Sequence, residues 1–182
     1  VFGACAGAAA YRRRMLDDIG FFDEDFFGTY EDLDLSFRAQ LRGYACMFVP
    51  GAIVYHRLTA TMKKYPARQA YLSQRNVEYA YWKNMPLELM ARGLPHRMLY
   101  ELGAAAYFLR RGVGKAFFSA KLDAIQELPA ILRKRKEIQN RKTVSNVRLR
   151  LGARTAWVRG RWNKLVAAWR RTKQPSGRLG TL

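Results

Sequence analysis

Apolar side chains recur along this chain with the spacing of amphipathic helices. Leu33, Phe37 and Leu41 are each four residues apart, which places them on one face of a helix. We predict that this helix begins near Glu31 and stops at Gly43, because glycine is favoured just beyond helix ends. The pattern therefore puts the acidic residues around position 31 at a helix N-terminus.

The same periodicity predicts further helices on both sides of this segment. A short helical pattern over residues 11–19 is closed by Gly20, and residues 21–30 form a loop rich in aromatic side chains. Beyond residue 66 the helical segments cover residues 68–84, 86–111 and 114–138, punctuated by Pro86, Pro95, Gly112 and Pro129. These later segments are typical of amphipathic helices.

Two short apolar runs predict β-strands. Residues 44–50 and 52–56 meet at Pro50 and Gly51, a turn signal between strands. The small and apolar residues 1–11 predict either a strand or a tightly packed loop. The sequence therefore predicts an α/β fold, in which a partial sheet is followed by helices.

Positive charge is concentrated towards the C-terminus. The chain has 33 Lys and Arg residues against 14 Asp and Glu, a formal charge of +19. Residues 1–132 contribute +4 of this charge and residues 133–182 contribute +15. A polyanionic partner is expected, and composition alone leaves nucleic acid, anionic lipid and a phosphorylated substrate open.

We predict three regions: 1–65, 66–142, and a basic tail 143–182 that is partly helical with a disordered end.

The tail also carries an apolar helix face. Trp162, Leu165, Val166 and Trp169 would lie together, opposite a face of Arg and Lys, which suits an anionic membrane surface. No run of about 18 apolar residues predicts a transmembrane helix. The chain begins at an apolar Val1 without a signal peptide, and we expect it to be a fragment that lacks an upstream half.

Cys5 and Cys46 lie in apolar surroundings and have no close pairing or neighbouring His. Buried free thiols are the favoured interpretation, with a disulfide as the alternative, and a reducing compartment fits.

An acidic cluster stands out in this basic chain. Asp25, Glu31, Asp32 and Asp34 fall within ten residues of one another. The structural interpretation is that acids at a helix start complement the positive end of the helix dipole, each contributing up to about 1 kcal/mol. The functional interpretation is that one carboxylate, favoured in its charged form by the same dipole, acts as a general base on a hydroxyl. Both can hold at once.

The order of motifs resembles a known enzyme family. A small-residue segment and a helix are followed by GFFDEDFF, YEDLDLSFRAQLRGY and FVPGAIVYH. This order resembles the C-terminal part of the catalytic domain of family 2 glycosyltransferases, especially the rhamnosyltransferase-like members. The resemblance covers roughly residues 3–61, and residues 75–86 resemble the helical region that often follows.

The resemblance implies a GT-A fold, so the predicted strands would belong to the C-terminal portion of a GT-A sheet. It also implies an inverting transfer of a sugar from a nucleotide-sugar donor to a polysaccharide or lipid-linked glycan. By the same resemblance, Asp32 matches the general base, and Glu31 helps to shape the acceptor site. Tyr30, beside this pair, is the aromatic residue expected on the acceptor side.

Asp34 and Arg38 are one helical turn apart, an order that favours an ion pair. We expect this pair to orient the motif, in preference to contacting substrate.

A divalent metal, Mg²⁺ or Mn²⁺, is implied as the stabiliser of the leaving diphosphate, held mainly by an Asp-x-Asp motif upstream of this chain. Two such strings occur here, at 23–25 and 32–34, but neither follows a hydrophobic strand and neither is expected to be the donor metal site. His56 ends the second predicted strand and is either structural or placed near the metal or diphosphate. His96 is expected at the surface.

Two other classes of function stay open. The Arg-rich tail could bind nucleic acid through phosphate contacts, although no nucleic-acid-binding motif supports this. The helices after residue 66 could instead make a peripheral membrane-binding module, which is compatible with a glycosyltransferase at the cytoplasmic face of the cell membrane. We expect the isolated segment to be inactive, because the donor-binding half would be missing.

Overall fold

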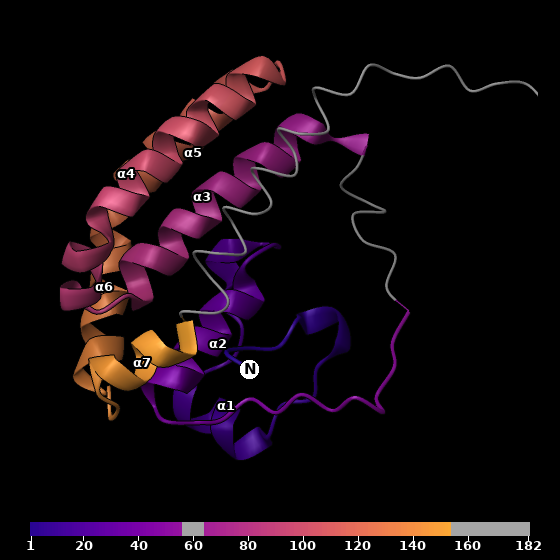
Figure 1. Ribbon diagram of the computed structural model, residues 1–182, viewed down its shortest axis with the longest axis vertical. Helices are drawn as coiled ribbons and strands as arrows, with labels where there is room; N and C mark the ends of the chain where they lie inside the picture. The colour runs from indigo at the N-terminus through magenta and orange to yellow at the C-terminus, as the bar shows by residue number, and fades with distance from the viewer. Residues whose placement is uncertain (56–63, 154–182) are drawn as a thin grey trace, which may run out of the picture.

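The computed structural model describes residues 1–55 and 64–153, and these residues form a helical structure (Figure 1). Seven α-helices and two short 3-10 helices occur within these ranges. In chain order they are η1 Ala6–Ala8, α1 Arg13–Ile19, η2 Glu24–Phe26, α2 Glu31–Leu41, α3 Pro66–Asn84, α4 Leu87–Arg110, α5 Gly114–Gln126, α6 Leu128–Asn140 and α7 Asn146–Ala153.

The prediction of an α/β fold with part of a GT-A sheet is wrong for the residues described, because none of them forms a β-strand. Residues 44–50 and 52–55 are irregular. Tyr44 is partly buried, but the apolar side chains from Met47 onwards are exposed, with Met47 81% and Tyr55 97% exposed. A strand is stable only when its backbone groups pair with a neighbouring strand. An apolar run therefore gives no strand here, since nothing in the described part of the chain pairs with it.

Helix α2 matches the prediction. It begins at Glu31, and of the predicted apolar stripe Phe37 and Leu41 are buried while Leu33 is partly buried. Leu35, which lies outside that stripe, is buried as well. Gly43 adopts a φ of +86° just beyond the helix, a conformation that glycine takes without strain. Helix α1 likewise ends at Gly20, with a φ of +81°.

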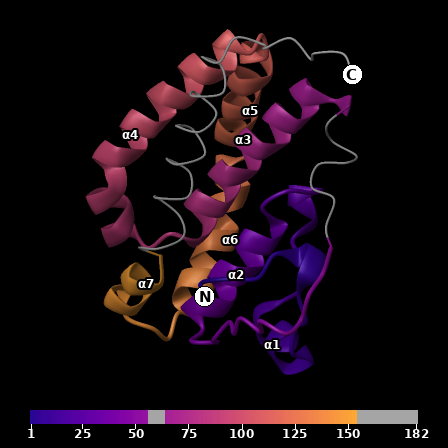
Figure 2. The same cartoon turned by 45° about the vertical axis from the view of Figure 1, so that its right-hand side comes forward.

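Helix α3 is the central element. It packs against α2, α5 and α6 (Figure 2). Its residues Tyr79, Ala80 and Tyr81 are buried in two core clusters. Phe26 of the aromatic loop and Phe37 of α2 contribute to the same two clusters. The motif-bearing residues 1–55 are thus packed onto the helices that follow.

The later helices differ from the predicted segments in two places. Pro95 lies inside α4 and does not end it; its side chain is exposed, so water can satisfy the backbone groups that proline leaves unpaired. The segment 114–138 divides at Glu127 into α5 and α6, and Pro129 falls in the first turn of α6, where its missing N–H costs little. No helix within residues 1–55 and 64–153 is long and apolar enough to span a membrane.

Both cysteines are free thiols, as predicted, but neither is buried: Cys5 is exposed and Cys46 is partly exposed. Most of the basic tail, including its tryptophans, lies outside the described residues.

Candidate active site

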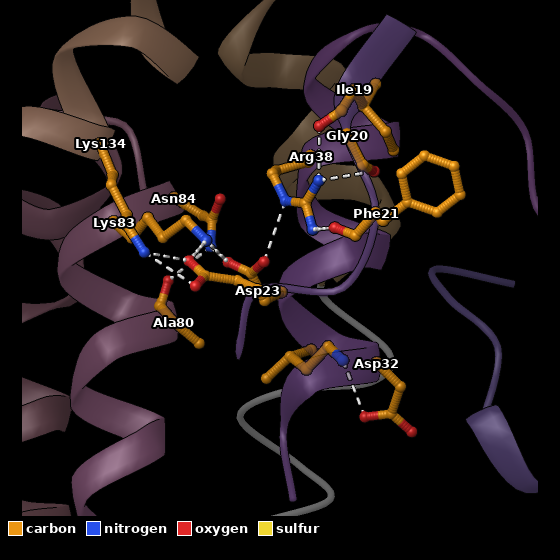
Figure 3. Close-up of polar contacts among 12 residues, drawn as sticks. Ile19, Gly20, Phe21, Asp23, Asp32, Arg38, Ala80, Lys83, Asn84 and Lys134 are labelled. Carbon is orange, nitrogen blue, oxygen red and sulfur yellow. Dashed lines mark hydrogen bonds and ion pairs between the residues drawn. The ribbon is translucent and has the colours of Figure 1, made fainter. Parts of the chain in front are cut away.

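The first turn of α2 carries the predicted catalytic residue, Asp32. The backbone N–H of Leu33 donates to Asp32 Oδ1 at 2.8 Å, and that of Ala6 donates to Oδ2 at 3.2 Å. The side chain is half-buried and forms no ion pair with any described residue. Figure 3 shows Asp32 apart from the cluster of Lys83 and Asn84. Its carboxylate is therefore oriented by two amides but not neutralised by a cation.

Asp34, two residues further on, is in the opposite situation. It is completely buried, and Arg38 Nε donates to its Oδ2 at 2.9 Å, the contact that the i, i+4 spacing predicts. Its other oxygen, Oδ1, accepts from Asn84 Nδ2 and pairs with Lys83 Nζ, both at 2.8 Å. The pairing of a buried carboxylate with two cations fixes α2 against α3.

Arg38 also holds the loop that precedes α2. Its guanidinium donates to the carbonyl oxygens of Ile19, Gly20 and Phe21, at the end of α1 and the start of the aromatic loop (Figure 3). The five donors of an arginine allow it to serve these three carbonyls and Asp34 at the same time.

Asp23 completes this group of buried charges. Its carboxylate accepts from Lys83 Nζ at 2.6 Å and from Lys134 Nζ at 2.8 and 3.0 Å. Burial acts to raise the pKa of Asp23, but the hydrogen bonds from Lys134 and Lys83 outweigh it and lower the pKa to about 2. We call Asp23, Asp34, Arg38, Lys83 and Lys134 the ion network; its members are buried or nearly buried except Lys134, which is 39% exposed.

The rest of the aromatic loop is held by α3. Asn76 Nδ2 donates to the carbonyl oxygens of Phe26, Gly28 and Thr29 at 2.7 to 2.9 Å. Thr29 and Tyr30 have φ values of +66° and +67°, which non-glycine residues rarely adopt. These side-chain hydrogen bonds hold the loop in a strained conformation immediately before Asp32.

Sequence reasoning did not find the residues that α3 and α6 contribute to this region. They are Asn76, Lys83, Asn84 and Lys134. Asn76, Lys83 and Asn84 are buried polar residues of α3, but in sequence they do not differ from the polar, solvent-facing positions of an amphipathic helix.

Two unpaired polar groups lie near Asp32. Glu31 Oε2 and the Tyr11 hydroxyl are buried without a hydrogen-bond partner among the described residues. Burial and the nearby charge of Asp32 raise the pKa of both groups. Unsatisfied buried groups beside a carboxylate are typical of a site that receives a polar ligand.

Tyr30 ends the strained loop as the residue that precedes α2, and its side chain packs against the core cluster of Phe26 and Tyr79. Its predicted contact with an acceptor stays a prediction.

The described residues do not fit a divalent metal. No group of three or more His, Cys, Asp or Glu side chains that could hold an ion occurs in the described part of the chain. Asp23 and Asp34, one from each Asp-x-Asp string, are engaged by lysine or arginine. His56, predicted near the metal or diphosphate, lies outside the described residues.

Comparison with known families agrees with the motifs. The chain matches the family described as Glycosyl transferase family group 2 over residues 3–172. The chain is therefore a glycosyltransferase enzyme. It belongs to family 2, and the match extends well beyond the motif region into the helices and the tail. No curated protein and no solved structure matches it.

Proposed function

We propose that the chain takes part in the inverting transfer of a sugar from a nucleotide-sugar donor to a hydroxyl of a glycan, with Asp32 as the general base. The observation that carries this proposal is the contrast between two carboxylates on one helix turn. Asp34 is buried and paired with Arg38 and Lys83, whereas Asp32 is half-buried without a cation. Among the described residues, Asp32 is therefore the carboxylate of this helix turn that has no cationic partner and remains available to accept a proton.

The proposed step conserves atoms and charge. The acceptor oxygen attacks the anomeric carbon while its proton passes to the Asp32 carboxylate. The bond from the anomeric carbon to the diphosphate oxygen breaks, and the nucleoside diphosphate leaves with the electron pair. Attack from the face opposite the leaving group inverts the anomeric configuration.

The groups around Asp32 suit an acceptor hydroxyl. Glu31 Oε2 and the Tyr11 hydroxyl each have unused hydrogen-bonding capacity. We assign Glu31 a role in shaping the acceptor site, because a polyhydroxylated sugar supplies the donors and acceptors that both groups lack.

The stereochemistry of the product tests the reaction type. The full-length protein is incubated with a panel of UDP-, GDP- and dTDP-linked hexoses and glycan acceptors, and nucleoside diphosphate release identifies an active pair. Proton NMR of the first product then reports its anomeric configuration. We expect inversion relative to the donor, and retention would contradict the proposed direct displacement.

A second proposal concerns location. We propose that the enzyme lies peripherally on the cytoplasmic face of the cell membrane and contacts it through α4. The observation that favours this is a stripe on α4 formed by Leu94, Met98, Leu102 and Leu109, each more than half exposed. Their spacing places them on one helix face, as in helices that lie in a membrane interface.

Vesicle binding tests this location. Met98→Gln with Leu102→Gln should weaken binding to anionic vesicles, whereas Ile53→Gln with Val54→Gln removes exposed apolar residues elsewhere and should not. Binding to duplex DNA at physiological salt without binding to vesicles would contradict the membrane proposal and favour a nucleic-acid partner.

A further inference from the structure

A groove of about 450 Å³ lies where the first turn of α4, one face of α6 and the start of α7 meet. No residue of α2 lines it, so it is distinct from the surroundings of Asp32. Its lining combines three cationic side chains with exposed leucines.

The cations of this groove are Arg135, Lys136 and Lys142. Arg135 Nη1 donates to the carbonyl oxygens of Trp82 and Met85 at 2.8 and 2.6 Å, which fixes the guanidinium at the end of α3. Burial lowers the pKa of Arg135, and no described carboxylate pairs with it. A half-buried arginine without a carboxylate retains donors for an anionic ligand.

The other charges on the groove leave it positive. Lys142 Nζ donates to Asn146 Oδ1 at 2.6 Å, an interaction with a neutral group, and Lys136 is exposed. Among the described residues of the lining, Glu88 is the one acidic residue, and it pairs with Arg92 at 2.9 Å. Three cations thus face one carboxylate that already has a cationic partner.

Apolar surface adjoins these cations. Leu87 is 74% exposed and Leu132 is 43% exposed, and both line the groove. Leu87 is spaced to lie on the same α4 face as Leu94 and Met98. A ligand that fits this surface carries an anion and an apolar part together.

We propose that this groove binds a phosphate group, and that the phosphate is carried by the headgroup of an anionic phospholipid. Arg135 and the two lysines would hold the phosphate oxygens, while Leu87 and Leu132 contact the apolar part of the lipid. The assignment of the phosphate to a lipid headgroup rests on the proposed membrane contact. The phosphate site itself does not depend on that contact, and neither claim depends on the role of Asp32.

The test uses the full-length protein and two probes. Inorganic phosphate is titrated while NMR follows the side-chain amides of Gln139 and Asn146, which line the groove. Flotation then measures binding to phosphatidylcholine vesicles with and without phosphatidylglycerol. The variant is Lys136→Gln with Lys142→Gln, which leaves the structural contacts of Arg135 intact. The control, Arg12→Gln with Arg14→Gln, removes the same charge from exposed positions elsewhere.

We expect the groove variant to weaken binding of phosphate and of phosphatidylglycerol vesicles by about tenfold relative to the control, which corresponds to loss of two charge contacts. An effect on vesicles alone supports a lipid headgroup as the ligand. If the groove variant weakens binding of inorganic phosphate but not of vesicles, the phosphate site is supported and its ligand is soluble. That result overturns the claim that a lipid carries the phosphate. If the groove variant and the control bind inorganic phosphate and vesicles equally well, the groove is not a phosphate site. This conclusion holds whatever turnover the Asp32 variants show.

Discussion

Lys83 Nζ lies 2.6 Å from Asp23 Oδ2 and 2.8 Å from Asp34 Oδ1, so one ammonium group of α3 joins the aromatic loop to the helix that carries Asp32. The lysine side chain is 5% exposed, and Asp34 is completely buried. Charges in such surroundings stabilise a structure only while all their partners are present. The position of α2 therefore depends on a residue of the helical region that follows the motifs.

Removing Lys83 should be strongly destabilising. Lys83→Met leaves two buried carboxylates with one cation fewer each, and we expect the free energy of unfolding to fall by about 3–5 kcal/mol. Urea denaturation of the full-length protein measures this change. Lys115→Met, at an exposed position of α5, should change the free energy by less than about 0.5 kcal/mol. Equal effects of the two substitutions would show that the network contributes no stability.

Arg38 should not be replaceable by lysine. Lysine keeps the charge near Asp34 but has one nitrogen, so it cannot also donate to the carbonyls of residues 19–21. We expect Arg38→Lys to lower the free energy of unfolding by about 2–4 kcal/mol, because buried carbonyls lose their donors. Arg13→Lys, in an exposed ion pair on α1, is the matched control. A wild-type urea midpoint for Arg38→Lys would show that the hydrogen bonds from Arg38 to the carbonyls of residues 19–21 do not stabilise the fold.

Asp23 should make stability depend on pH in the acid range. Its pKa of about 2 in the folded protein lies below the ordinary value of 3.8, so the charged form stabilises the fold. This contribution is complete above pH about 4 and is lost as the pH falls towards about 2, with a slope of at most about 1.4 kcal/mol per pH unit. Urea midpoints between pH 5 and 2 should fall less steeply for Asp23→Asn than for wild type. Parallel curves would contradict the assignment.

The ionised carboxylate of Glu31 should lower the free energy of unfolding at neutral pH. Burial and Asp32 raise its pKa, so the folded protein binds this proton more strongly than the unfolded chain does, and stability falls as the pH rises through that range. We expect Glu31→Gln to raise the free energy of unfolding at pH 7 by about 0.5–2 kcal/mol, while turnover falls. A variant that is destabilised with unchanged turnover would show that Glu31 is structural.

The features that could be predicted from the sequence are those that depend on the spacing of residues within a single helix. The four-residue interval of Leu33, Phe37 and Leu41 defines α2, and the interval from Asp34 to Arg38 defines their ion pair. Both depend only on the geometry of one helix. The acidic cluster could likewise be located from sequence, because its residues are neighbours in the chain.

The parts that sequence missed depend on distant segments. An apolar run such as 44–50 becomes a strand only where another segment pairs with it, and the run itself carries no information about that partner. Lys83 and Asn84 reach Asp34 from about fifty residues away, and Lys134 reaches Asp23 from still further along the chain. In sequence these residues resemble the solvent-facing side of an amphipathic helix, so their roles follow only from packing.

The measurement that tests the central claim most directly compares Asp32→Asn with Asp17→Asn in the full-length enzyme, using the donor and acceptor pair that wild type turns over. Asp17 is a half-exposed carboxylate of α1, so its replacement controls for the loss of one charge. We predict that Asp32→Asn lowers kcat by about 10²–10⁴-fold while donor Kd and the urea midpoint stay at wild-type values. A folded Asp32→Asn enzyme with the same kcat as Asp17→Asn would contradict the assignment of Asp32 as the general base.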